Sequence, residues 1–66
     1  MEVKIKFREE ESEIEIEEGS IIEDVLERVG INKETVIVKR NGKIIPPEED
    51  VNDKDYLECI RIISGG

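Results

Sequence analysis

Hydrophobic and charged residues alternate along the first part of the chain. The alternating apolar residues are Val3, Ile5, Phe7, Ile14 and Ile16. A period of two residues is typical of a half-buried strand, because successive side chains point to opposite faces of a sheet. We therefore expect strands at 3–8 and 13–17, joined by a charged turn at 9–11. The two strands would form a hairpin with one apolar and one charged face.

The apolar spacing becomes helical after Gly19, which interrupts the second strand. Ser20 and Glu23 stand three residues apart, which is the spacing of a capping box at a helix N-terminus. Gly30 suits the left-handed position that commonly follows the last turn of a helix. The apolar residues between these signals are Ile22, Val25, Leu26 and Val29. They predict a short amphipathic helix of about ten residues.

Strand patterns return after the helix. Asn41-Gly42 is a strong signal for a two-residue type I′ turn, and it separates apolar stretches at 36–38 and 43–45. Pro46-Pro47 must end the second stretch, because proline has no N–H to donate to a ladder. The sequence therefore predicts a second hairpin with a short return strand.

The order of the predicted elements indicates a fold class. An acidic stretch at 48–55 is expected to be a surface loop, and residues 56–63 a last strand. The first and last strands can then lie parallel in the middle of a mixed sheet. We predict an α+β protein of the β-grasp type, with a four- to five-stranded mixed sheet and one helix packed on one face. This domain would span residues 1–63, and residues 64–66 would form a flexible C-terminal Gly-Gly tail.

Composition narrows the possible functions. The 66 residues allow one small domain, and a formal charge of −8 makes nucleic acids and anionic membranes poor partners. We find no apolar run long enough to span a bilayer and no signal-peptide pattern, so we expect a soluble, cytoplasmic protein that is monomeric when free. A single cysteine and no histidine leave neither an intramolecular disulfide nor a thiolate-rich zinc site. The high glutamate and lysine content resembles that of thermophile proteins.

The sequence ends in Gly65-Gly66. The simplest interpretation is a frayed end. The functional interpretation is that a carboxylate on a bare glycine tail can enter a tunnel closed to any residue with a Cβ. Glycine also lets the backbone approach a nucleotide closely. At the end of a β-grasp strand the functional interpretation is the stronger of the two.

Two segments and the order of elements carry a resemblance to a known family. The segments are Asn41-Gly42 followed by Ile44-Ile45-Pro46, and the closing run Asp55-Tyr56-Leu57-Glu58-Cys59-Ile60-Arg61-Ile62-Ile63-Ser64-Gly65-Gly66. The chain resembles the ubiquitin-like β-grasp sulfur carriers, which include the thiamin-biosynthesis sulfur carrier, the small subunit of molybdopterin synthase and the ubiquitin-related modifiers. Two positions depart from the thiamin carrier: Pro47, where a basic residue is usual, and Ser64, where a third glycine is common.

The resemblance implies a function. In this family a partner activating enzyme uses ATP and Mg²⁺ to adenylate the C-terminal glycine carboxylate, which is then converted to a thiocarboxylate. That role would fall on Gly66, with Gly65 allowing the tail to thread into the partner. The sulfur donor would be a protein such as a cysteine desulfurase. The sulfur would pass to a downstream synthase in thiamin or molybdenum-cofactor biosynthesis, or to a tRNA base.

Two other functions stay open at this point. One is a ubiquitin-like protein modifier joined through Gly66 to target lysines. The other is a binding module in which the terminal Gly-Gly is incidental.

The chain itself carries no sign of the activating chemistry. It has no glycine-rich phosphate loop and no histidine for general base catalysis. We therefore expect no enzymatic activity, no metal site and no cofactor bound by this chain, with the nucleotide site on the partner. The acidic clusters at 9–11 and 48–50 lack the spacing of a cation loop and are interpreted as solvated surface.

Strand alternation near the C-terminus predicts a docking surface. If Leu57 and Cys59 face the helix, Ile60 and Ile62 point to the opposite face, where Ile37 would join them. A contiguous group of exposed isoleucines suggests an interface with the activating enzyme. The competing explanation is that β-propensity alone fills a central strand with isoleucine.

The same alternation predicts which way the neighbouring side chains point and what role they have. The inward positions of the adjacent strands would be Val36, Val38 and Ile45. Cys59 is interpreted as a small buried hydrophobe rather than a reactive thiol. Arg61, close to the tail, would guide the tail towards an acidic groove or be an ordinary solvated charge.

Overall fold

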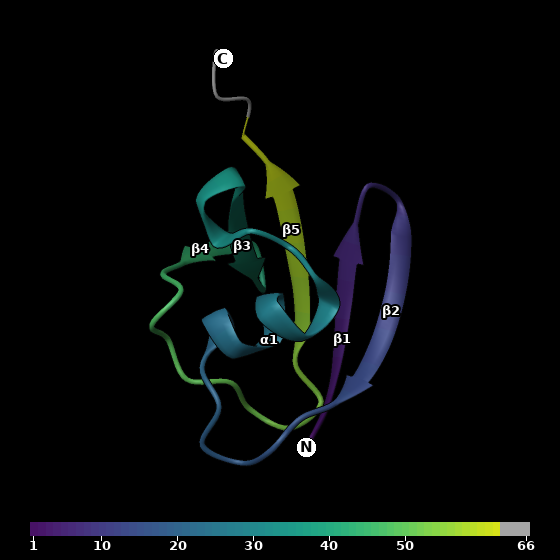
Figure 1. Ribbon diagram of the computed structural model, residues 1–66, viewed down its shortest axis with the longest axis vertical. Coiled ribbons are helices and arrows are strands. Elements are labelled where there is room, and N and C mark those ends of the chain that lie inside the picture. The colour runs from purple at the N-terminus through teal and green to yellow at the C-terminus, as the bar shows by residue number, and fades with distance from the viewer. Residues whose placement is uncertain (63–66) are drawn as a thin grey trace.

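The computed structural model describes residues 1–62 and confirms an α+β architecture of the β-grasp type (Figure 1). The elements are β1 Glu2–Phe7, β2 Glu10–Glu15, α1 Ile22–Val29, the 3₁₀ turn η1 Lys33–Thr35, β3 Val36–Arg40, β4 Lys43–Ile45 and β5 Tyr56–Arg61. The five strands form one mixed sheet in the order β2-β1-β5-β3-β4. β1 and β5 are parallel neighbours, and the other neighbouring pairs are antiparallel. The first and last strands thus lie side by side, as the order of elements predicts.

The N-terminal hairpin has a tighter turn than the sequence predicts. Arg8 and Glu9 adopt positive φ angles of 54° and 65°, and these two residues alone connect β1 to β2. The predicted boundaries, a turn at 9–11 and a strand at 13–17, are therefore wrong, because β2 starts directly after the turn and pairs along the whole of β1. Two left-handed residues match the twist of the flanking strands, even where neither residue is glycine.

Helix α1 begins one residue later than the capping pattern predicts. Its N-cap is Ile21, and the Asp24 carboxylate accepts a hydrogen bond from the Ile21 N–H at 3.0 Å. Ser20 instead donates its hydroxyl to a backbone carbonyl three residues earlier, at 2.7 Å, so the predicted Ser20–Glu23 capping box is wrong. Gly30 ends the helix with φ 77° and ψ 27°, the left-handed conformation that was predicted.

The segment between β4 and β5 explains the shifted N-cap. The carbonyls of Pro47 and Glu49 accept hydrogen bonds, each 2.9 Å long, from the first two N–H groups of α1. They replace the side-chain acceptor that an isoleucine N-cap cannot supply. Val51, in the same segment, is 5% exposed and belongs to the core. The predicted loop at 48–55 is therefore irregular, as expected, but anchored to the helix.

Arg40, at the end of β3, holds this loop from the side of the sheet. Its guanidinium donates to the carboxylates of Asp55 at 3.0 Å and Glu49 at 3.1 Å, and to the carbonyl of Asp50 at 3.0 Å. The side chains of Arg40 and Asp55 are only 17% and 12% exposed. Because little water reaches the Arg40–Asp55 pair, its hydrogen bond ties the loop firmly to β3.

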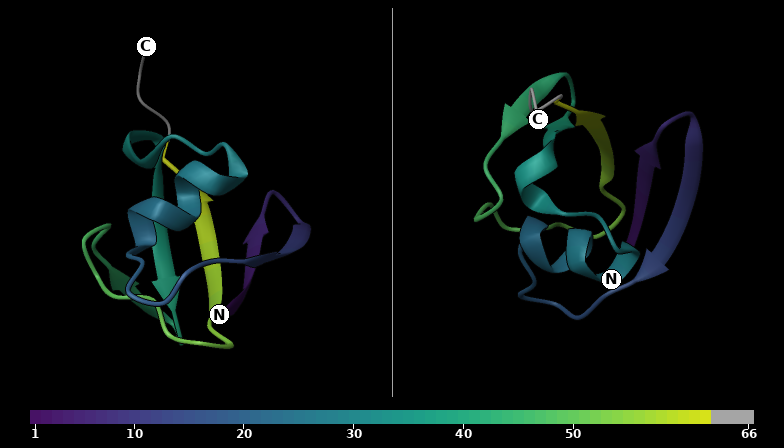
Figure 2. Two further views of the ribbon diagram at one scale, coloured as in Figure 1. Left: turned by 60° about the horizontal axis from the view of Figure 1, so that its bottom comes forward. Right: turned by 45° about the horizontal axis from the view of Figure 1, so that its top comes forward.

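The core lies between the sheet and α1, which covers one side of the sheet (Figure 2). Leu57 and Cys59 of β5 face the helix, as predicted, with exposed fractions of 0% and 5%. The predicted inward positions Val36 and Val38 are buried, whereas Ile45 is half-buried. The buried core consists of Val3, Ile5, Ile16, Ile22, Val25, Leu26, Val36, Val38, Val51, Leu57 and Cys59. The other face of the sheet presents the alternate residues of each strand.

Candidate functional site

The predicted chemical site lies beyond the end of β5. Gly65 and Gly66 are outside the described residues, as is the predicted boundary between domain and tail, so those assignments stay predictions. The described chain follows β5 to Arg61 and reaches Ile62, whose N–H donates to the Thr35 carbonyl at 2.8 Å. β5 pairs with β1 as far as Cys59 and with β3 as far as Arg61, so the end of the strand that leads to the tail is held on the β3 edge.

The uncovered face of the sheet carries the three predicted isoleucines. Ile37 of β3 stands directly opposite Ile60 of β5. Ile60 is 36% exposed and Ile62 45% exposed, while Ile37 is half-buried. The hydrogen bond from Ile62 to Thr35 extends the β3–β5 pairing by one residue, so strand alternation places Ile62 on the same face as Ile60. The structure therefore brings these three side chains to one face.

A fourth isoleucine, Ile44, shares this face and is missed by the sequence reasoning. It is 63% exposed, more than any other large hydrophobic residue in 1–62. It stands opposite Lys39 in the β3–β4 register, one diagonal position from Ile37. The sequence contained the signal, because the alternation that turns Ile45 inward also turns Ile44 outward. The four side chains, here called the isoleucine patch, are Ile37, Ile44, Ile60 and Ile62.

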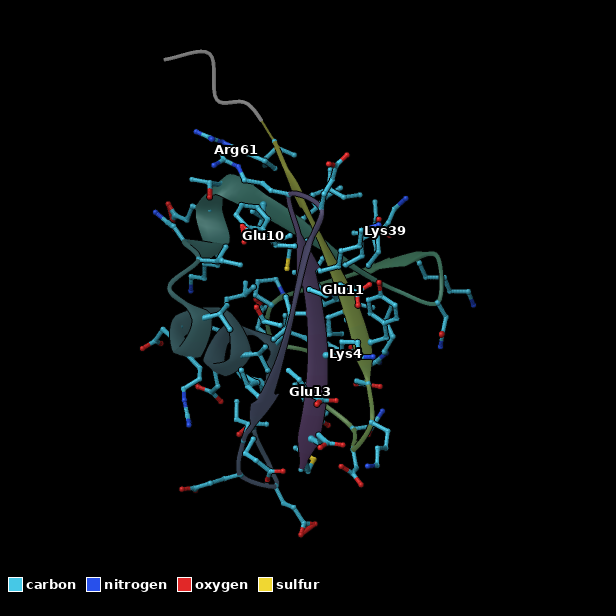
Figure 3. The ribbon with its side chains drawn as sticks, turned by 90° about the vertical axis from the view of Figure 1, so that its right-hand side faces the viewer. Lys4, Glu10, Glu11, Glu13, Lys39 and Arg61 are labelled. Atoms are coloured by element: carbon cyan, nitrogen blue, oxygen red, sulfur yellow. The ribbon has the colours of Figure 1, made fainter. Side chains whose placement is uncertain are left out.

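Arg61 does not share the face of the isoleucine patch. It stands opposite the buried Val36 in the β3–β5 register, so its side chain leaves the sheet on the side of α1. Figure 3 shows Arg61 directed away from Lys4 and Lys39. A role for Arg61 in guiding the tail stays a prediction, but such a role would be exerted from the opposite side of the sheet.

Charged side chains occupy the remainder of the uncovered face. Four of them form a row across four strands: Glu11, Lys6, Glu58 and Lys39. In the next row Lys4 stands between Glu13 and Tyr56. Figure 3 shows Lys4, Glu11 and Lys39 on the side of the sheet that faces away from α1. The uncovered face therefore has a charged half and an apolar half.

Tyr56 belongs to the charged half and is also missed by the sequence reasoning. It is 47% exposed, and its hydroxyl donates to the Glu11 carboxylate at 2.9 Å. This hydrogen bond, followed by burial and the charge of Glu11, raises the pKa of the Tyr56 hydroxyl above its ordinary value. A hollow of about 240 Å³ lies beside the ring. It is lined by Lys6, Lys39, Asn41, Gly42, Tyr56 and Glu58.

Cys59 has the environment of a structural residue. It is buried, and burial raises the pKa of its thiol to about 11. The thiolate is the nucleophilic form of cysteine, and it is scarce near neutral pH when the pKa is this high. The prediction that Cys59 is a small buried hydrophobe is confirmed.

The acidic clusters supply no metal site in the part of the chain that the structure describes. Across residues 1–62, no group of three or more possible ligands is arranged to hold a metal ion. The cluster at 9–11 is exposed, and in the cluster at 48–50 Glu49 is engaged by Arg40. No helix in 1–62 is both long enough and apolar enough to cross a membrane.

The fold and this surface together define a class. One helix packs across a mixed five-stranded sheet, and the central last strand leads towards a Gly-Gly end. The free face of the sheet carries an apolar patch beside that strand. These features are those of a ubiquitin-like β-grasp protein.

Comparison with known proteins identifies the family within that class. The model of the ThiS family matches residues 3–66. The sulfur carrier protein TtuB of Thermus thermophilus is 37% identical over 57 residues, which cover 86% of this chain and 88% of TtuB. An uncharacterized protein of Archaeoglobus fulgidus is 40% identical over 68 residues, with 100% of both chains covered. The chain belongs to the ThiS family of ubiquitin-like sulfur carrier proteins.

Proposed function

We propose that this protein carries sulfur as a thiocarboxylate on Gly66. The observation that carries the proposal is the match to the ThiS family, which extends over residues 3–66 and so includes Gly65-Gly66. Similarity to a sulfur carrier protein over most of both chains supports the same role. In this proposal the protein is a substrate and carrier, and catalysis belongs to its partners.

The proposed chemistry needs activation by a partner. A free carboxylate resists nucleophiles because it is anionic and resonance-stabilised. A partner enzyme that uses ATP and Mg²⁺ would convert the Gly66 carboxylate into a mixed anhydride with AMP and release pyrophosphate. The outer sulfur of a donor protein's persulfide would then displace AMP, so that a C–O bond breaks and a C–S bond forms. A thiol would cleave the resulting acyl disulfide, which leaves the thiocarboxylate and a new disulfide. Because the reaction consumes ATP, we place it in the cytoplasm.

The isoleucine patch is the surface that we assign to docking on the activating enzyme. Specific interfaces usually have a desolvated apolar centre, and a few residues there supply most of the binding energy. The patch lies along β3, β4 and β5, and Ile62 is the last described residue before the tail. Docking at this position would place the tail at the enzyme, and Gly65, lacking a Cβ, would let it thread towards the nucleotide.

The sulfur would come from a donor protein such as a cysteine desulfurase. It would pass to a synthase that makes a precursor of thiamin or of the molybdenum cofactor, or to a tRNA base. The enzyme that makes each product would receive the sulfur by binding the surface of the carrier.

Intact mass spectrometry of the protein purified from its own cells tests the proposal. We expect a population in which one oxygen has been replaced by sulfur. The matched control is a chain that lacks Gly66, which should have the same circular dichroism spectrum and no sulfur. A series of larger conjugates on target lysines would instead support a protein modifier. A chain that gains neither sulfur nor conjugates, in cells or with its activating enzyme and ATP, would contradict the proposal.

A further inference from the structure

Three lysines of the uncovered face are unpaired within the described residues. The ammonium nitrogens of Lys4, Lys6 and Lys39 lie more than 4 Å from every carboxylate oxygen in 1–62. Elsewhere Lys33 and Lys54 make ion pairs of 2.6 and 2.8 Å with glutamates. In a chain of net charge −8, lysines that stand beside carboxylates without pairing are available to another molecule.

The hollow beside Tyr56 has a surplus of donors. Lys6 and Lys39 stand on either side of Glu58 in the strand registers, and all three line the hollow. Glu11, the other carboxylate of this row, accepts the Tyr56 hydroxyl and does not line the hollow. The turn at 41–42 adds an amide side chain to the rim. Among the groups that line the hollow, two ammonium groups face one carboxylate, and this excess of one positive charge suits a single anionic group; Glu11, opposite Lys6, stays outside the lining.

We propose that this hollow receives a carboxylate side chain of the activating enzyme, bridging Lys6 and Lys39. The inference rests on the proposed function and specifies the chemistry of the partner's surface. A basic side chain that approached Glu58 would meet both lysines and be repelled. A polyanion such as a nucleic acid would be repelled by the net charge of −8. One carboxylate at the border of an apolar interface could pair with both lysines, while Glu58 stays between them.

The position of the hollow gives this contact a purpose. Glu58 and Ile62 are four residues apart along β5, roughly 13 Å at the rise of an extended strand. The hollow adjoins the isoleucine patch at Ile44, which stands opposite Lys39, and Ile62 marks the far end of the patch, so the two are neighbouring contact points on one face. Apolar contact is non-directional, whereas a charged contact at a second point fixes the register of the interface. The lysine contact would thus set the direction in which the tail leaves β5 towards the nucleotide site.

The test compares charge reversals on the two sides of the sheet. Lys39→Glu and Lys6→Glu alter the hollow, and Lys43→Glu is the matched control. Lys43 is exposed and stands opposite Arg40, so its side chain is on the other face of the same hairpin. The readout is ATP–pyrophosphate exchange by the purified activating enzyme, with KM for the carrier and kcat measured separately.

We expect Lys39→Glu to raise KM on the order of tenfold with kcat unchanged, and Lys43→Glu to change KM by no more than about twofold. The KM of the unaltered carrier should also rise with ionic strength more steeply than the KM of Lys39→Glu. Salt screens the lysine–carboxylate attraction, which the variant no longer has. Melting temperatures check that each variant is folded. If a charge reversal unfolds the protein, Lys39→Gln or Lys6→Gln takes its place.

Each remaining outcome has a separate meaning. Equal KM values for Lys39→Glu and Lys43→Glu would overturn the contact and leave the carrier function standing. No exchange with the unaltered carrier would contradict the proposed function, and the contact would fall with it. A self-association of the free protein that Lys39→Glu abolishes in sedimentation would assign the hollow to a second copy and overturn the proposal.

Discussion

The two faces of the sheet both carry aliphatic side chains, but α1 covers only one of them. The face beneath α1 is apolar and closed, with Val3 and Leu57 at 0% exposure. The other face keeps Ile44 at 63% and Ile62 at 45% exposure, next to rows of charged side chains. Burying an aliphatic side chain contributes about 1.5–3 kcal/mol. On the closed face this energy stabilises the fold, whereas the exposed aliphatic surface of the open face gains no such stabilisation within residues 1–62.

This difference predicts opposite results from the same substitution at two positions of β5 that face opposite sides of the sheet. Leu57→Glu should have the largest effect, because it places a carboxylate under the helix with no partner. An uncompensated buried charge costs roughly 3–5 kcal/mol, which is comparable to the whole stability of a small domain. Thermal unfolding followed by circular dichroism should show no cooperative transition. A cooperative transition near the unaltered melting temperature would contradict the assigned faces.

Ile60→Glu is the counterpart on the open face. The side chain is already 36% exposed, so we expect the melting temperature to change little. Binding to the activating enzyme should weaken by about 2 kcal/mol or more, because the new charge would be buried unpaired at the interface. Isothermal titration calorimetry measures the loss. If Ile60→Glu melts early and still binds normally, the isoleucine patch is core and the docking surface lies elsewhere.

Arg40→Met tests how strongly Arg40 holds the loop between β4 and β5 beside the closed face. The substitution removes two ion pairs and the hydrogen bond to the Asp50 carbonyl, and we expect a loss of about 2 kcal/mol in the free energy of unfolding. Arg61→Met is the control, since Arg61 is exposed and makes no ion pair with residues 1–62; its effect should be below about 0.5 kcal/mol. Urea unfolding of both variants checks this. Equal losses would show that the loop is held by its backbone alone.

Cys59→Ala should have the smallest effect. Removing a buried sulfur leaves a small cavity and should cost about 1 kcal/mol, while sulfur loading of Gly66 continues. A folded variant that no longer gains sulfur in the mass spectrum would show that the thiol takes part in the chemistry.

The same variant also tests a pH dependence of the stability that is due to Cys59. Burial raises the pKa of the Cys59 thiol from 9.0 to about 11, so the folded state favours the neutral thiol. Its contribution to stability is therefore complete below pH 9 and is lost as the pH rises from 9 to 11. Between pH 9 and 11 the melting temperature should therefore decrease more steeply for the unaltered protein than for Cys59→Ala. Parallel curves would contradict the assigned pKa direction.

The assignment of side chains to the two faces could be made from the sequence because it depends on a period of two. Leu57, Cys59 and Ile60 follow that period through β5, and the parallel pairing of β1 with β5 follows from the order of elements. Asn41-Gly42 marked its turn because both residues adopt positive φ readily; their φ angles are 54° and 78°. These features are local or repeat along the chain.

The features that could not be predicted depend on contacts between elements, most of them distant in sequence. Arg8 and Glu9 form a left-handed turn that their residue types do not favour, because the pairing of β1 with β2 imposes it. The helix start was misplaced because its first N–H groups are satisfied by carbonyls from the 46–55 segment, more than twenty residues away. The pairing of Tyr56 with Glu11 likewise joins opposite ends of the chain.

The central position of β5 has a consequence for the order of events during biosynthesis. The strand carries two core side chains and pairs with both β1 and β3, so the sheet cannot close until the last part of the chain has left the ribosome. Contacts between segments this distant in sequence also slow folding. A nascent chain cut short before Tyr56 would lack both the centre of the sheet and the tail. A partner that docks on the open face of the sheet would therefore bind only chains in which β5 has already been made and paired.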